Sequence, residues 1–204
     1  MTPFVTVVSG APRSGTSLMM QMLGAGGMEL VTDGVRRADR DNPRGYFELE
    51  AARQLPADAQ WLERAVGRAV KLVHVLVPRL PTRHSYRILL MRRDWSEVLA
   101  SQRAMLARMS HQGGETCGLE RRSGVPEGPD EGRLAEIFDA QLAEVERWAA
   151  SRPEAELLRV DYNALVAHPL PLAREVSAFL EGRLDAEDMA AAVLPSLYRQ
   201  RSFR

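Results

Sequence analysis

The most constraining feature of the sequence is the stretch VVSGAPRSGTSLMMQML, residues 7–23. Residues 4–9 are apolar and β-branched, which is typical of a buried strand. Apolar residues then recur at helical spacing from Thr16 to Leu23, and the glycines of GAGG follow them. A strand, a glycine-bearing turn and a helix in direct succession are the context of an anion-binding loop, because a helix N-terminus presents N–H groups without intrahelical partners. The sequence therefore predicts an anion site at residues 10–17.

The loop GAPRSGTS fits the phosphate-loop pattern G-x-x-x-x-G-K-[ST] at every defined position except one. Gly10, Gly15 and Ser17 have the required spacing, but Thr16 stands where the pattern has lysine. Arg13 brings a positive charge from a different position of the loop. Additional hydroxyl donors come from Ser14, Thr16 and Ser17. The simpler interpretation is a turn that only caps the following helix.

The rest of the chain alternates between strand and helix patterns. Besides 4–9, strands are expected at 69–77, 86–91 and 155–160. Helices are expected at 16–23, after the turn at 41–50, and at 95–109, 134–148, 171–182 and 186–193. This alternation predicts an α/β, P-loop-like three-layer fold with a central, mainly parallel sheet and helices on both faces. We expect residues 1–204 to form a single domain with a flexible loop at 110–132.

Composition and charge narrow the class of protein. The 27 basic residues balance the 27 acidic ones, so net charge gives no reason to expect nucleic acid or a membrane as a partner. Cys117 is the only cysteine, which excludes a disulfide within the chain and a multi-cysteine zinc site. The N-terminus lacks the basic region of a signal peptide, and no apolar run approaches the ~20 residues of a membrane span. A cytoplasmic location is expected.

The strand ends bear on the kind of phosphate ligand. A phosphate-loop kinase holds Mg²⁺ with an aspartate at a strand end. The strand 86–91 runs instead into RRD, so two arginines precede Asp94. No histidine pair or carboxylate cluster has metal-ligand spacing, and we expect no metal. Asp161 does end a predicted strand, so a nucleotide or small-molecule kinase with an atypical loop stays open as an alternative.

Two blocks of the sequence resemble the sulfotransferase family that uses 3′-phosphoadenosine-5′-phosphosulfate (PAPS). APRSGTS is similar to the family's 5′-phosphosulfate loop, and YRILLMRRDWSEVLASQ is similar to its 3′-phosphate block, a strand ending in arginine with a serine eight residues later. NPRGYFE and DYNALVAHP also resemble family segments. The resemblance implies transfer of a sulfonyl group from PAPS to a hydroxyl or amine of a small-molecule acceptor. It implies that the cofactor is bound by Arg13, Ser14, Gly15, Thr16, Ser17, Arg93 and Ser101.

Two residues are candidates for the general base of such a reaction. Glu48 of GYFE ranks first, because acidic bases occur in several branches of the family, and Glu50 is its substitute. His74 ranks second: a cytosolic branch has K-x-H, whereas Lys71 and His74 form K-x-x-H. In the reaction that the resemblance implies, Lys71 would stabilise the bridging oxygen of the leaving group. The simpler interpretations are a first-turn helix residue for Glu48, a core histidine for His74 and a sheet-edge side chain for Lys71.

Simpler roles also exist for the remaining candidates. Arg93 can pair with Asp94 or Glu97 at a helix start, and Ser101 can be an ordinary helix hydroxyl. The basic tail, with Arg199 and Arg201, either closes over the nucleotide or is solvated. A nucleotide-binding module without catalysis is therefore a third hypothesis, and a homodimer is left open.

Overall fold

A central sheet of five parallel strands organises the molecule. The computed structural model describes residues 3–40, 42–111 and 131–194, and for 106–111 the backbone only. The strand order is β2-β3-β1-β4-β5, and all four pairings are parallel. The strands are β1 (Phe4–Gly10), β2 (Leu30–Val31), β3 (Ala69–Lys71), β4 (Ser85–Arg92) and β5 (Ala155–Asp161). The predicted parallel sheet of an α/β fold is confirmed.

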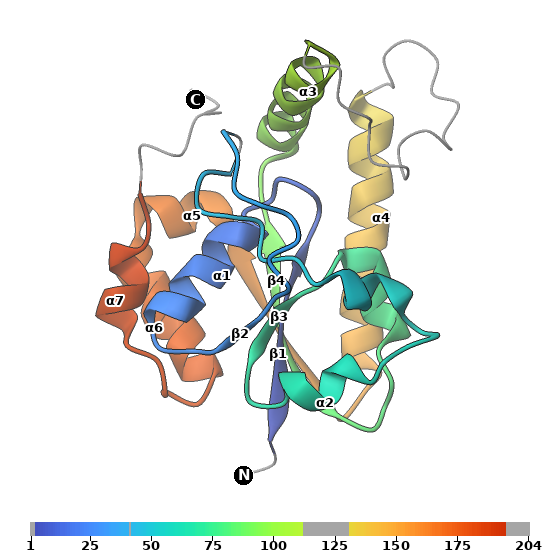
Figure 1. The fold of residues 1–204 in the computed structure, drawn as a ribbon, viewed down its shortest axis with the longest axis vertical. Helices are drawn as coiled ribbons and strands as arrows, with labels where there is room; N and C mark the ends of the chain where they lie inside the picture. Colours follow the sequence, from blue (N-terminus) through green and yellow to red (C-terminus); the bar gives the residue numbers. More distant parts are fainter. Residues whose placement is uncertain (1–2, 41, 112–130, 195–204) are drawn as a thin grey trace.

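Helices cover both faces of this sheet (Figure 1). One face packs against α1 (Thr16–Ala25), α5 (Tyr162–Ala167), α6 (Pro169–Phe179) and α7 (Ala186–Ala191). The other face packs against α2 (Trp61–Ala65), α4 (Glu131–Ala150) and the 3₁₀ helices η1 (Glu50–Gln54) and η2 (His74–Arg79). The helix α3 (Trp95–His111) extends beyond the upper end of the sheet in Figure 1. The predicted three-layer arrangement is confirmed.

The central strand β1 shows why the sequence reads as a continuous apolar run. All seven of its residues are buried. Val8 faces the cluster that contains α1 and α6, whereas Val5 and Val7 face the cluster that contains α2 and α4. Because alternate side chains of a strand point to opposite faces, a strand covered on both sides has no polar face.

The strand predicted at 69–77 is wrong beyond Lys71. β3 ends there, and the helix η2 occupies His74–Arg79. The N–H of Leu72 still bonds to the carbonyl of Val8, and the chain then leaves the sheet. Pro78 has no N–H to give to a strand ladder. A short apolar run also shows no clear period, so its pattern could not separate a strand from a helical turn.

The other differences involve short elements. The prediction missed β2, α2 and α5, which have 2, 5 and 6 residues and are too short to show periodicity. The helix expected after the turn at 41–50 is the 3₁₀ helix η1. The predicted loop at 110–132 falls almost entirely outside the described residues, as do Cys117, Arg199 and Arg201. Within the part of the chain that the structure describes, no helix is long and apolar enough to cross a membrane.

Candidate functional site

The loop 10–17 lies at the carboxyl end of β1, in the middle of the sheet (Figure 1). From β1 the chain first builds β2 and β3 on one side and then crosses to β4 on the other. In open α/β sheets, ligands bind outside the carboxyl ends of the strands at such a reversal of strand order. The topology therefore brings the loop to the edge where ligands bind in this architecture.

The carbonyl oxygens of the loop are turned toward protein donors. The Gly10 carbonyl lies 3.1 Å from His74 Nδ1, and the Ala11 carbonyl lies 3.2 Å from Ser14 N. The Arg13 carbonyl lies 3.1 Å from Arg93 Nη1, and the Gly15 carbonyl lies 3.1 Å from Met19 N. The first N–H groups of α1 have no carbonyl within the helix to bond to, and no side chain caps the helix at Gly15. Because carbonyl oxygens repel an anion and N–H groups attract one, this arrangement suits an anion at the start of α1.

Two residues of the loop fit this interpretation in detail. The side chain of Ser14 is 1% exposed, and its hydroxyl has no partner among the described residues. A buried hydroxyl without a partner costs free energy. Arg13 has a left-handed backbone with φ of 68°, a conformation that costs about 1–2 kcal/mol in an L-residue. The hydrogen bond from Arg93 to the Arg13 carbonyl supports this conformation.

Gly15 is required by its surroundings. It stands just before α1 with φ of 98°, in the left-handed region. A Cβ at this position would collide with the ring of Tyr162, the first residue of α5. The sequence showed the need for glycine in the loop but gave no signal of the aromatic ring that packs on it.

Arg13, Arg93 and Ser101 come together from three elements of the chain. Arg13 Nε donates to Ser101 Oγ at 3.0 Å, and Arg93 Nη1 donates to the Arg13 carbonyl at 3.1 Å. Ser101 is buried within α3. The fold thus brings the two sequence blocks that resemble the family motifs into direct contact at the loop.

Arg93 is held firmly by an ion pair. Its Nε lies 3.0 Å from Glu97 Oε2, and the two side chains are only 7% and 2% exposed. The Arg93 guanidinium also lies over the ring of Tyr162, 4.4 Å from its centre. Asn163 donates to the other oxygen of Glu97. The simpler interpretation, an ion pair with Glu97, is confirmed, whereas Asp94 accepts from the N–H of Ser96 at the start of α3.

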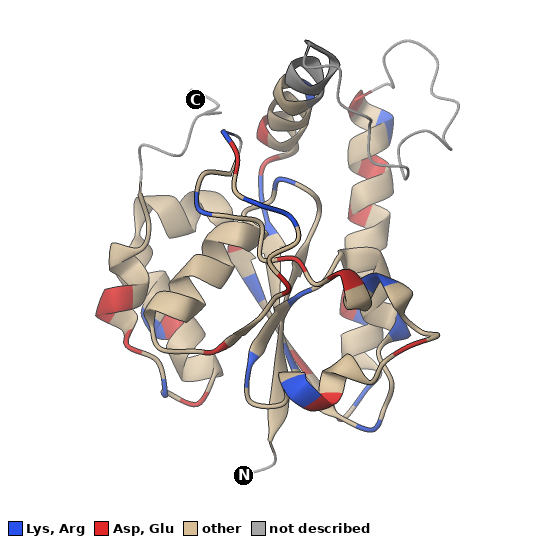
Figure 2. Cartoon of the chain, viewed as in Figure 1, with Lys and Arg blue, Asp and Glu red and all other residues tan. Residues whose placement is uncertain are grey.

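Lys71 links the loop to Glu48. Its Nζ lies 3.4 Å from Ser17 Oγ, 3.0 Å from the Tyr46 carbonyl and 3.6 Å from Glu48 Oε1. Asn42, which the sequence analysis did not single out, donates to Ser17 Oγ at 2.8 Å. Residues 42–46 therefore lie against the first turn of α1. In Figure 2 the ribbon of α1 is tan throughout, so this helix has no charged residue, while the segment above it carries both blue and red residues.

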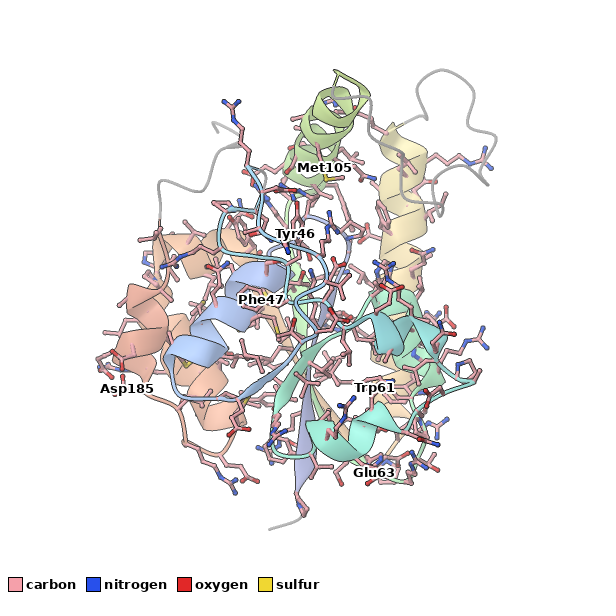
Figure 3. All side chains as sticks on the ribbon, in the orientation of Figure 1. Tyr46, Phe47, Trp61, Glu63, Met105 and Asp185 are labelled. Atoms are coloured by element: carbon pink, nitrogen blue, oxygen red, sulfur yellow. The ribbon has the colours of Figure 1, made fainter. Side chains whose placement is uncertain are left out.

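Glu48 lies among three cations. Besides Lys71, its carboxylate contacts Arg36 at 3.0 Å and Arg53 at 3.3 Å. The Arg36 guanidinium stacks on the ring of Tyr46, whose hydroxyl donates to Asp39. In Figure 3, Tyr46 lies between the upper end of the sheet and α3, which carries Met105, and Phe47 lies lower, beside α1. These contacts fix Glu48 on the side of the loop where Lys71 lies.

Burial changes the protonation equilibria of two groups here. Burial lowers the pKa of the Lys71 ammonium below its usual 10.5, and the charge of Glu48 opposes this shift. Burial, together with the hydrogen bond to Asp39, raises the pKa of the Tyr46 hydroxyl to about 12. Lys71 therefore gives up its proton more readily than an exposed lysine.

Of the other candidates, Glu50 and Asp161 lie apart from this arrangement, and His74 meets the loop from the other side. Glu50 is exposed and pairs with Arg53, while Asp161 accepts from the N–H of Ala164 and caps α5. His74 begins η2 and contacts the loop from the opposite face to α1, through the Gly10 carbonyl. Among the described residues, no group of three or more His, Cys, Asp or Glu side chains is placed to hold a metal ion. The expected lack of a metal stays a prediction.

Comparisons with known proteins give structural likenesses but no family. No protein-family model and no curated protein matches the chain. Among solved structures, it is similar to a sulfotransferase domain from the curacin biosynthetic pathway, with 16% identity, 88% of this chain and 74% of that chain covered, and a TM-score of 0.49. It is also similar to an unliganded sugar kinase from Janibacter sp., with 13% identity, 97% and 98% coverage, and a TM-score of 0.42. Likenesses this distant do not decide between the two activities.

The collision at Gly15 predicts that substitution by alanine lowers the free energy of unfolding more at Gly15 than at Gly27, although both glycines have a φ of 98°. Gly27→Ala, where a Cβ meets nothing within 4 Å, should cost about 1–2 kcal/mol from backbone strain alone. Gly15→Ala should cost about 1–3 kcal/mol more, because the Tyr162 ring must move. Urea unfolding of both variants measures the difference. Equal free energies of unfolding would contradict the packing described here.

The ionisation of Lys71 can be observed directly, since it is the only lysine of the chain. In protein labelled with ¹³C-lysine, we expect the Lys71 signal to titrate below 10.5. Glu48→Gln should lower the midpoint further, because a nearby carboxylate stabilises the ammonium form. Glu50→Gln is the control and should leave it unchanged, since Glu50 is exposed and pairs with Arg53. A midpoint at or above 10.5, or a rise in Glu48→Gln, would disprove this account.

Proposed function

We propose that the chain is a PAPS-dependent sulfotransferase acting on a hydroxyl or amine of a small-molecule acceptor. The observation that carries the proposal is the 3.0 Å hydrogen bond from Arg13 to Ser101. These residues belong to the two blocks that resemble the family's 5′-phosphosulfate loop and 3′-phosphate block, and they are 88 positions apart. A contact between the blocks is what a single nucleotide carrying both phosphate groups requires.

The proposed cofactor site divides into two anion positions. The 5′-phosphosulfate is assigned to the start of α1, with the N–H groups of Gly15, Thr16 and Ser17 and the hydroxyl of Ser14. The 3′-phosphate is assigned to Ser101, Arg93 and the side chain of Arg13. Glu97 already balances the charge of Arg93. Both arginines can form charge-assisted hydrogen bonds to phosphate oxygens.

The chemical step is assigned to Glu48 and Lys71. PAPS supplies the sulfonyl group. Glu48 takes the proton of the acceptor as the acceptor oxygen or nitrogen bonds to sulfur, and the bond from sulfur to the bridging oxygen breaks. Lys71, between Glu48 and Ser17, donates a hydrogen bond to that bridging oxygen as it gains negative charge. His74 is not given the base role, because both of its ring nitrogens already have protein partners.

Binding of the spent cofactor tests the site. We expect 3′-phosphoadenosine-5′-phosphate to raise the melting temperature without added metal, by roughly the equivalent of 2.7 kcal/mol at a hundredfold excess over its Kd. Arg93→Ala should lose the preference for this nucleotide over adenosine 5′-phosphate. Arg92→Ala is the control, since Arg92 pairs with Asp139 of α4. Stabilisation by ATP with Mg²⁺ alone would overturn the proposal and favour the kinase.

Turnover separates the enzyme from a non-catalytic module. Glu48→Gln should lower kcat by about 10²–10⁴-fold, the usual contribution of a general base, while the nucleotide affinity stays within a few-fold. Glu50→Gln should leave kcat near the wild-type value. Sulfonyl transfer is measured with PAPS and a panel of hydroxyl and amine acceptors. An unchanged kcat in Glu48→Gln would exclude Glu48 as the base, and nucleotide binding without any turnover would favour the binding module.

A further inference from the structure

His74 makes a second set of contacts that the proposed reaction does not use. The side chain is 2% exposed and lies between the start of the loop and α4. Its Nδ1 is 3.1 Å from the Gly10 carbonyl, and its Nε2 is 2.7 Å from Oε1 of Gln141. The edge of the ring also meets Phe138 of α4. Every polar atom of this imidazole is therefore engaged within the protein.

The partners of the ring fix the proton on Nδ1. A backbone carbonyl can only accept a hydrogen bond, so Nδ1 must carry a proton that it donates to Gly10. The amide of Gln141 can serve Nε2 in either orientation, because a half-turn exchanges the amide oxygen and nitrogen: its oxygen accepts from a protonated Nε2, and its NH₂ group donates to a bare one. Neither nitrogen is left to take a proton from an acceptor.

The position of the Gly10 carbonyl matters for the loop. Gly10 is the last residue of β1, and a carbonyl turned toward the ligand would repel an anion. His74 belongs to the side of the sheet that packs against α4, whereas α1 packs on the other side. A hydrogen bond to His74 therefore holds this carbonyl away from the first turn of α1. Since a peptide unit is planar, the N–H of Ala11 is turned in the opposite direction.

We propose that His74 is a positioning residue of the phosphate loop and not a proton acceptor. Its Nδ1–H holds the Gly10 carbonyl away from the anion, and Gln141 of α4 holds the ring in the orientation that this bond requires. The role in affinity rests on the proposed function, in which the loop binds the 5′-phosphosulfate. The hydrogen-bonding state of the ring does not, because it exists without any ligand.

Two substitutions at His74 distinguish positioning from proton transfer. His74→Leu removes the donor, and we expect the affinity for 3′-phosphoadenosine-5′-phosphate to fall about tenfold, as for one lost hydrogen bond. The amide of His74→Asn places an N–H close to the position of Nδ1–H, so this variant should recover most of the lost affinity and most of kcat. A proton acceptor would behave differently: His74→Asn would bind the nucleotide normally and lose kcat by 10²-fold or more. That result would overturn the inference.

A ligand-free measurement keeps the inference testable if the wild type does not bind the nucleotide, which would refute the proposed function instead. In ¹⁵N-histidine NMR spectra, the ring of His74 should show a protonated Nδ1. Gln141→Leu should release the ring and shift both ring nitrogen signals, while His84→Asn, at the contact with Glu63, should change neither. A protonated Nε2 with a bare Nδ1 would exclude the bond to Gly10 and overturn the inference.

Discussion

The structure depends on a central strand that is buried on both sides and ends in a tightly held loop. β1 pairs with β3 on one side and with β4 along its whole length on the other, so its position is fixed by two ladders. Two of the side chains that converge on the loop come from the carboxyl ends of these neighbours: Lys71 from β3, and Arg93 just after β4. Because parallel strands end at the same edge, pairing alone gathers these side chains around residues 10–17.

Charge at this edge is distributed unevenly. The charge of Arg93 is balanced by Glu97 inside the protein, and Lys71 and Glu48 form a second, more open pair. Buried pairs of this kind orient side chains more than they stabilise the fold, since desolvation offsets much of their attraction. In the proposed site, backbone N–H groups and hydroxyls at the start of α1 therefore share the binding of the anion with the arginines. A loop without the usual lysine would bind its anion in this way.

Part of this arrangement could be predicted from the sequence. The glycine spacing and the apolar runs predicted the loop, β1, α1, β4 and the parallel sheet, because these signals are local and repeat over several residues. The pairing of Arg93 with Glu97 was also a stated alternative, since residues four apart meet on a helix. His74 was misplaced in a strand because VHVLV has no period that separates a strand from a 3₁₀ turn. Tyr162 on Gly15, Asn42 on Ser17 and Gln141 on His74 gave no sequence signal.

The sequence by itself determined the fold class and the place of the loop, because backbone propensities and hydrophobic patterning act over short stretches of chain. Only the tertiary structure decided which side chains meet there. Contacts such as Arg13 with Ser101 join positions 88 residues apart, and they depend on strand order, on the direction in which each strand ends and on helix packing. It also decided the surroundings of His74, where two partners from distant elements take both ring nitrogens. A residue type suggests a chemistry, but the partners of its atoms determine which chemistry remains accessible.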